Sequence, residues 1–281
     1  MPRDSRRCFG RRETLAILGA GALAGRRAAR AAAPAFRFTS LDHVALAVSD
    51  VPGSLRFYAR VFGNTVLKEQ QNPRRYLRLG PCYVAIAPPG RGQESHAVNH
   101  FCPGIAGFQL EEAKHQLDQL GIAYREAAGV GLFVPDPDGS QIQLWTENSW
   151  SQLGRTASPE TIAAGAPLLR PTGIDHILLN VSDPEKSAPF YEKLFGPVAL
   201  RNNNRTWFRA GKSRIGLLRA AAGERPGVNH FCLSAEAFDS AAVAKPLEES
   251  GARVQPSDAQ GAIEFRDPEG ILVQITPPRQ A

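Results

Sequence analysis

Two histidines and a glutamine recur at matching positions in the two halves of this 281-residue chain. The pentapeptide VNHFC stands at 98–102 and again at 228–232, with a histidine at the centre of each copy. Two imidazoles and one side-chain oxygen on one face suit a first-row divalent ion that keeps coordination positions open for substrate oxygens. The candidate ligands are His43, His100 and Gln143 in the first half, and His176, His230 and Gln274 in the second.

The alternation of apolar and polar residues predicts that each trio shares one face of a sheet. Residues 42–48 and 175–181 alternate as half-buried strands do, which turns the first histidine of each half away from the apolar face. The last strand of each half turns its glutamine the same way. In the VNHFC strand, simple alternation places His100 on the same face as Val98.

Internal duplication supplies the elements that position these residues. Residues 41–63 and 174–196 are identical at 11 of 23 positions without a gap, and further matches follow at nearly constant spacing. Each half has the order βαβββ twice over, with the first helix ending at Gly63 or Gly196. The turns DPDG and DPEG separate the last two strands, where Gly139 and Gly270 can take positive φ.

We therefore expect an α+β fold of two tandem domains, at 40–147 and 172–277. The segment between them, 148–171, is rich in Ser, Pro, Gly and Ala and is expected to be a linker.

The order of elements, the repeat length and the six side chains resemble the vicinal oxygen chelate superfamily, which includes glyoxalases, bleomycin-resistance proteins and extradiol dioxygenases. Members pair βαβββ units into an open curved sheet, or cup, with helices on its outer face. They hold a divalent metal through side chains of the first, fifth and eighth strands. The resemblance thus implies that both trios bind Fe, Mn, Zn or Ni. Extradiol and fosfomycin-resistance members carry glutamate where this chain has Gln143 and Gln274, and losing that charge is expected to weaken or abolish metal binding.

Arginines and aromatic residues also recur on the third strand of each half. Arg74 and Tyr76 match Arg205 and Trp207. If these side chains face the cup, they can bind an anionic or enediolate-like substrate; if they face outward, they are solvated edge charges. No catalytic residue is identified in the first half, and Glu264 is the candidate base in the second.

Single features have simpler explanations. One strand histidine is usually a hydrogen-bonded or solvated residue, so the metal interpretation depends on the joint placement of three residue types in both copies. Cys102 and Cys232 are expected to be small buried core residues. With Cys82 they form an odd set, which does not predict a disulfide framework.

The first 35 residues resemble a twin-arginine export signal. A basic start precedes an apolar run of about 11 residues and a small-residue cleavage site, and the run is shorter than the ~20 residues that span a bilayer. We expect a periplasmic or secreted protein without a stable membrane anchor. The leader holds 8 of the 33 basic and 2 of the 27 acidic residues. The remainder is neutral, with 25 of each, and gives no support for nucleic-acid binding.

Two functions remain open from the sequence, and a third arrangement, one catalytic and one structural domain, is disfavoured because both copies keep the trio. The first is an exported, metal-dependent enzyme, a glyoxalase-like lyase or isomerase or an extradiol-type dioxygenase, acting on a small substrate with vicinal oxygens. The second is a metal-free cup that binds an aromatic or antibiotic-like molecule, as resistance members of the family do. Either protein would be a monomer or a homodimer.

Overall fold

The computed structural model describes residues 33–236, 238–257 and 259–279, and residues 31–281 form one compact unit. The predicted export signal therefore lies almost entirely outside the described residues. Among the described residues, no helix is long and apolar enough to cross a membrane.

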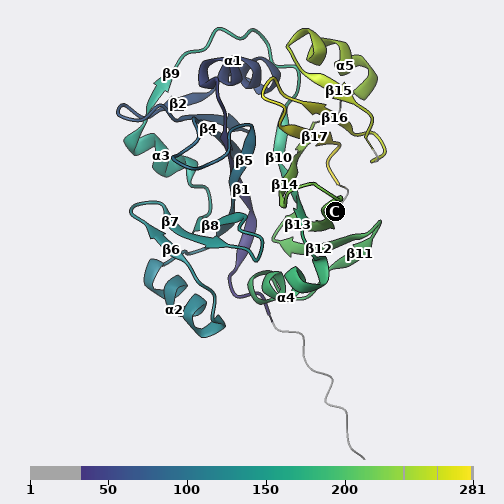
Figure 1. Ribbon diagram of the computed structural model, residues 1–281. Coiled ribbons are helices and arrows are strands. Elements are labelled where there is room, and N and C mark those ends of the chain that lie inside the picture. Colours follow the sequence, from purple (N-terminus) through teal and green to yellow (C-terminus); the bar gives the residue numbers. More distant parts are fainter. Residues whose placement is uncertain (1–32, 237, 258, 280–281) are drawn as a thin grey trace, which may run out of the picture. The chain divides into compact units, whose positions relative to one another are not determined.

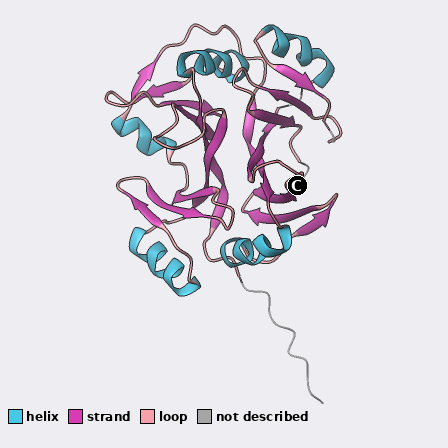
Figure 2. Cartoon of the chain, viewed as in Figure 1, coloured by secondary structure: helices cyan, strands magenta, loops and turns pink. Residues whose placement is uncertain are grey.

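The first repeat follows the predicted order βαβββ twice (Figures 1 and 2). Its elements are β1 (Phe38–Ala47), α1 (Val51–Phe62), β2 (Val66–Lys68), β3 (Arg75–Leu79), β4 (Cys82–Ala87), β5 (Ala97–Ile105), α2 (Leu110–Leu120), β6 (Arg125–Ala127), β7 (Gly131–Pro135) and β8 (Gln141–Thr146).

The second repeat has the same order, so the predicted α+β architecture is confirmed. Its elements are β10 (Pro171–Val181), α4 (Pro184–Phe195), β11 (Leu200–Asn202), β12 (Arg205–Ala210), β13 (Ser213–Arg219), β14 (Gly227–Ala235), α5 (Ser240–Glu249), β15 (Arg253–Gln255), β16 (Ile263–Arg266) and β17 (Leu272–Thr276).

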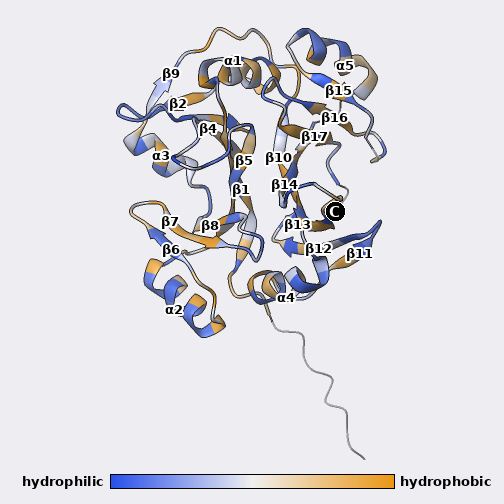
Figure 3. Ribbon diagram, viewed as in Figure 1, coloured by the Kyte–Doolittle hydropathy of each residue, from blue (hydrophilic) through white to orange (hydrophobic). Residues whose placement is uncertain are grey.

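Local sequence sets the ends of the first helix in each repeat. Asp50 caps α1 by accepting a hydrogen bond from the backbone N–H of Gly53 at 2.9 Å, and Asp183 caps α4 by accepting one from the backbone N–H of Glu185 at 3.2 Å. Both helices stop at a glycine with positive φ, +107° at Gly63 and +83° at Gly196. Amphipathic patterning directs each helix onto the sheet, and Figure 3 shows polar and apolar residues alternating around α2.

Strand pairing brings the first, fifth and eighth strands of each repeat side by side. β1 pairs in parallel with β4 and antiparallel with β5, and β5 pairs in parallel with β8. In the second repeat β10, β13, β14 and β17 pair in the same way. An antiparallel bridge between Leu41 of β1 and Ile174 of β10 joins the two repeats into one open sheet.

Buried tyrosines link the repeats reciprocally. The hydroxyl of Tyr58 on α1 donates to Asp267 in the DPEG turn of the second repeat at 2.8 Å. The hydroxyl of Tyr191 on α4 donates to Asp136 in the DPDG turn of the first repeat at the same distance. Both tyrosines are fully buried, as expected of core residues. Each tyrosine thus supplies a hydrogen-bond donor to a buried carboxylate of the other repeat.

The segment expected to be a linker is partly structured. It contains α3 (Trp150–Thr156) and β9 (Ser158–Glu160), and β9 adds to the first repeat by pairing with β2. Trp150 and Leu153 of α3 pack against a small apolar cluster that includes Tyr76 and Tyr83 on the cup face. This segment therefore forms part of the wall of the first cup, because its few large apolar residues find partners there.

Candidate functional site

Two β-bulges place the candidate ligands beside their hydrogen-bonding partners. In β1 the register slips between Leu41 and His43, which leaves Asp42 as the extra residue and turns it toward the ring of His43. In β5 the slip leaves Asn99 as the extra residue beside His100. The second bulge also corrects the expectation for Val98, which packs against the hydrophobic core instead of sharing the cup face with His100.

His43 is held in one orientation by a buried network. Its Nδ1 lies 2.9 Å from Oδ1 of Asp42, and its ring stacks on Tyr83 with centroids 4.5 Å apart. Asp42 also accepts hydrogen bonds from the backbone N–H and the hydroxyl of Ser149, at 3.0 Å and 2.5 Å. Because a carboxylate only accepts, Nδ1 of His43 carries the proton and Nε2 carries a free lone pair.

Gln143 presents its oxygen to that lone pair. Its amide nitrogen donates to the backbone carbonyl of Val130 at 2.6 Å, which fixes which end of the amide is the oxygen. Oε1 of Gln143 then lies 3.0 Å from Nε2 of His43. In the neutral ring, two acceptors therefore face each other at hydrogen-bond distance, an arrangement that a bound cation, or a second proton on the imidazole, stabilises.

His100 completes the first trio. Its ring lies edge-on to that of His43, with centroids 5.6 Å apart, and its Nδ1 lies 2.8 Å from the side-chain oxygen of Asn99. Burial, the neighbouring His43 and the guanidinium of Arg74 lower the pKa of His100 well below its usual range, and Arg125 contributes in the same direction. The imidazole is therefore neutral near pH 7 and available as a ligand.

The distance between two of the candidate ligands is compatible with a divalent metal. Two ligands in adjacent positions on an ion, each about 2.1 Å from it, stand roughly 3 Å apart. The 3.0 Å separation between His43 and Gln143 matches that spacing. The structure thus brings together all three predicted ligands of the first half.

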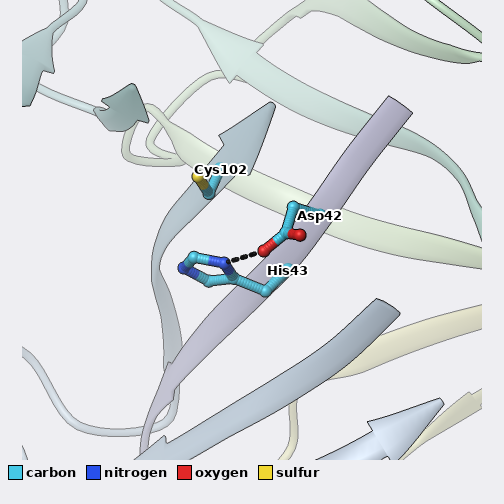
Figure 4. A group of neighbouring side chains, drawn as sticks. All are labelled: Asp42, His43 and Cys102. Atoms are coloured by element: carbon cyan, nitrogen blue, oxygen red, sulfur yellow. Dashed lines mark hydrogen bonds and ion pairs between the residues drawn. The ribbon is translucent and has the colours of Figure 1, made fainter. Parts of the chain in front are cut away.

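A different set of potential ligands lies behind His43. Asp42, His43 and Cys102 place their ligand atoms within 4.8 Å of one another (Figure 4). Both oxygens of Asp42 are already engaged, however, and burial raises the pKa of the Cys102 thiol well above its usual range. We interpret this group as support for the His43 ring, and the expected burial of Cys102 and its counterpart Cys232 is confirmed.

The second repeat fixes its histidines by a longer relay. The carboxylate of Glu224 accepts from the amide nitrogen of Asn180 at 2.7 Å, so the oxygen of Asn180 faces the amide nitrogen of Asn229 at 3.2 Å. The oxygen of Asn229 then faces Nδ1 of His230 at 2.8 Å. His230 must donate from Nδ1, so its Nε2 carries a lone pair directed at Nε2 of His176, 3.1 Å away.

His176 has the same tautomer, because its Nδ1 lies 2.6 Å from Oδ1 of Asp175. Burial lowers the pKa of both histidines, to about 3 for His230. Arg214 and Arg279 also bind Asp175, at 2.9 Å and 2.6 Å. His176 and Arg214 hold the pKa of that carboxyl well below its usual range. Two neutral imidazoles again converge, but two guanidinium groups stand close behind them.

Gln274 is held differently from Gln143. Its amide nitrogen donates to Glu264 at 2.8 Å and to the hydroxyl of Ser257 at 3.1 Å. Glu264 of β16 lies opposite Gln274 in register, where the first repeat has Phe133 opposite Gln143. Glu264 is therefore buried against the glutamine amide, and its carboxylate is engaged in holding that side chain.

A cavity of about 650 Å³ lies over the first trio. His43, His100 and Gln143 all line it, and all of its lining residues lie between positions 43 and 156. Tyr76 and Tyr83 line it from the cup face, and α3 closes part of it. The first trio is thus open to a small molecule.

The predicted substrate-binding residues lie near the two trios. Arg74 and Tyr76 line the cavity, where the Tyr76 hydroxyl donates to Glu69. Burial and this hydrogen bond raise the pKa of Tyr76 to about 12. In the second repeat the Trp207 ring lies edge-on to His176 with centroids 5.1 Å apart, and the charge of Arg205 helps to lower the pKa of His230.

Several side chains that surround the candidate ligands were not predicted from the sequence. Asp42 and Asn99 support the two histidines, and a signal for them existed: the pairs Asp-His and Asn-His recur unchanged in the second copy. Glu69 and Ser149 lie outside the matched segments, and no pattern in the sequence distinguishes them.

Comparisons with known proteins agree with this architecture. A family model described as the Glyoxalase/Bleomycin resistance protein/Dioxygenase superfamily matches residues 40–144 and 173–275. Glutathione transferase FosA of Serratia marcescens is 30% identical over 116 residues, which cover 37% of this chain and 79% of that protein.

Solved structures share the fold at low identity. A catechol 2,3-dioxygenase aligns with a TM-score of 0.60 at 19% identity, covering 88% of this chain and 91% of its own. The 2,3-dioxygenase LapB from Pseudomonas sp. KL28 aligns with a TM-score of 0.63 at 16% identity, covering 87% and 94%.

Proposed function

Because the chain belongs to the glyoxalase, bleomycin resistance protein and dioxygenase superfamily, we propose that it is a metal-dependent enzyme whose working site is the cavity of the first repeat. Its substrate is a small molecule that offers two vicinal oxygens. The observation that carries the proposal is the pair of facing acceptors, Nε2 of His43 and Oε1 of Gln143, 3.0 Å apart at the cavity wall.

The ligands would be His43, His100 and Gln143. Bound there, a divalent ion of Fe, Mn, Zn or Ni would supply a Lewis acid for two adjacent oxygens of the substrate. Asp42 keeps the proton of His43 on Nδ1 and so keeps Nε2 available. Ser149 in turn holds Asp42.

The cavity also supplies groups that can bind and protonate a substrate. Arg74 and Tyr76 would contact its oxygens, and Glu69 would accept a proton directly or through the hydroxyl of Tyr76. We assign Glu69 the role of the base, for which the sequence offered no candidate in the first half. A base in the same cavity as the candidate ligands suits glyoxalase-like isomerisation or lyase chemistry, and extradiol cleavage of a ring is the other reaction of this class.

The second repeat would be a weaker metal site. Its candidate ligands are His176, His230 and Gln274, and the facing imidazoles supply the same argument. The positive charges of the two arginines that bind Asp175 would repel a metal ion at this site, which lowers the affinity for a cation.

Export is the remaining part of the proposal. The arginine-rich leader at 1–35 would direct the folded protein to the periplasm or outside the cell. Fractionation of cells that express the full chain, with N-terminal sequencing of the exported form, tests this: a new amino terminus near residue 36 is expected. Retention of the intact chain in the cytoplasm would contradict it.

Elemental analysis of the untagged protein tests metal dependence. We expect close to one Fe, Mn, Zn or Ni per chain, lost in His43→Ala and largely kept in His176→Ala. His115→Ala is the matched control, because His115 lies on the exposed face of α2 and contacts Gln119. A metal-free protein that binds an aromatic or antibiotic-like molecule with micromolar affinity, unchanged in His43→Ala, would establish the binding protein instead.

A further inference from the structure

The cavity over the first trio has an excess of positive charge. Arg74, Arg125 and Arg155 line it, whereas Glu69 is its one acidic lining residue. The carboxylate of Glu69 is already engaged by the hydroxyl of Tyr76. A divalent ion on the trio would add further positive charge, so the walls favour an anionic guest.

Two of these arginines lie close to the trio. The guanidinium of Arg125 lies over the ring of Phe133, 4.8 Å from its centroid, and Phe133 lies edge-on to His100 with centroids 5.1 Å apart. Arg74 is near enough to both His100 and Tyr76 to act on them electrostatically.

Neither guanidinium forms an ion pair with a carboxylate anywhere in the described part of the chain. Neighbouring Arg75 differs, because its side chain bonds Glu160 at 2.5 Å. Two arginines that line one cavity without acidic partners can bind an anionic group there.

We infer that the substrate carries a separate carboxylate, and that Arg125 and Arg74 bind this group while the vicinal oxygens of the substrate lie at the trio. This inference rests on the proposed function and adds the substrate class. Arg125 binds this group from the β6–β7 side, with its guanidinium oriented by the ring of Phe133. Arg74 binds it from the end of the β2–β3 connection, directly before β3.

A matched pair of chelating probes tests the inference. 3,4-Dihydroxybenzoate and 3,4-dihydroxybenzamide share the vicinal hydroxyls and differ in the charge of one group. Their affinities for Co²⁺-loaded protein are measured by titration of the cobalt absorption bands. A charge-assisted contact at a partly exposed site is worth about tenfold, so the acid is expected to bind at least about ten times more tightly. The preference should shrink as salt is added.

Variants assign the preference to residues. Arg125→Gln and Arg74→Gln should each bring the ratio of the two affinities toward one, at unchanged cobalt content. Arg56→Gln, on α1 and outside the cavity lining, should leave the ratio as it is. Arg125 is exposed, so its variant is expected to fold normally.

The outcomes separate this inference from the proposed function. Equal binding of both probes, or a preference that survives Arg125→Gln and Arg74→Gln, overturns the anionic substrate and leaves the metal site standing. Failure of cobalt to bind, or failure of both probes to bind the cobalt-loaded protein, overturns the proposed function, and the inference with it.

Discussion

Replacing Gln143 by glutamate tests whether this residue is a metal ligand. The change restores a carboxylate at a position where the amide oxygen lies 3.0 Å from Nε2 of His43. It also removes the amide nitrogen that donates to the carbonyl of Val130 at 2.6 Å. The added carboxylate favours the metal-bound protein, whereas the lost amide donor destabilises the metal-free protein.

The magnitudes predict opposite signs for stability and for metal affinity. In the metal-free protein, the Val130 carbonyl loses its donor and faces a carboxylate oxygen, which lowers the free energy of unfolding by about 1–3 kcal/mol. With metal, one added negative charge near the ion contributes about 4 kcal/mol per unit of ionic charge at 4 Å and an effective dielectric constant of about 20. Even after the first cost is subtracted, metal affinity should rise at least about tenfold.

Competition with a chromophoric chelator measures the affinity, and urea unfolding of the metal-free protein measures the stability. Gln274→Glu is the matched control, because the Gln274 amide donates to Glu264 at 2.8 Å. A second carboxylate there would repel the first, so stability should fall further with little gain in affinity. If Gln143→Glu folds and binds metal no more tightly than the unmodified protein, Gln143 is not a ligand.

Three further results are expected. Asp42→Asn should lower metal affinity about 10- to 100-fold in the chelator competition, because the proton of His43 is no longer fixed on Nδ1. Burial lowers the pKa of His230 to about 3, whereas the unfolded value is about 6.5. The unfolded chain therefore binds the extra proton, and metal-free stability should fall by up to several kcal/mol as pH drops from about 6.5 toward 3. Urea unfolding across this range should show a shallower decline in His230→Gln. Tyr58→Phe should lower the free energy of unfolding by about 1–3 kcal/mol, because Asp267 loses its buried donor, and equal urea midpoints for the two proteins would exclude that role.

Repetition made the fold predictable. Alternation placed β1 and β10, glycines marked the ends of α1 and α4, and the two copies supported each other wherever one was ambiguous. The same comparison found the six candidate ligands, because the copies kept them while about half of the neighbouring residues changed.

The details that control the chemistry were not predictable from alternation. A bulge adds one residue to a strand without changing its composition, so strict alternation misplaced Val98 and overlooked Asp42. The contacts of α3 with the first cup depend on two apolar side chains, Trp150 and Leu153, in a segment whose composition resembles a linker. Tautomers depend on the orientation of amides such as Asn180, which only the surrounding acceptors decide.

The two repeats carry the same three candidate ligand types but differ in the residues behind them, so the two sites need not have the same role. Behind the first trio, Asp42 is held by the neutral Ser149, so its negative charge still acts on His43 and on a cation beyond it. Behind the second, Asp175 is bound by Arg214 and Arg279, which cancel that charge. We therefore expect the support behind each first histidine to contribute to how strongly each repeat attracts a cation. The first repeat combines the uncancelled charge of Asp42 with the large cavity, so we expect it to be the half that turns over substrate.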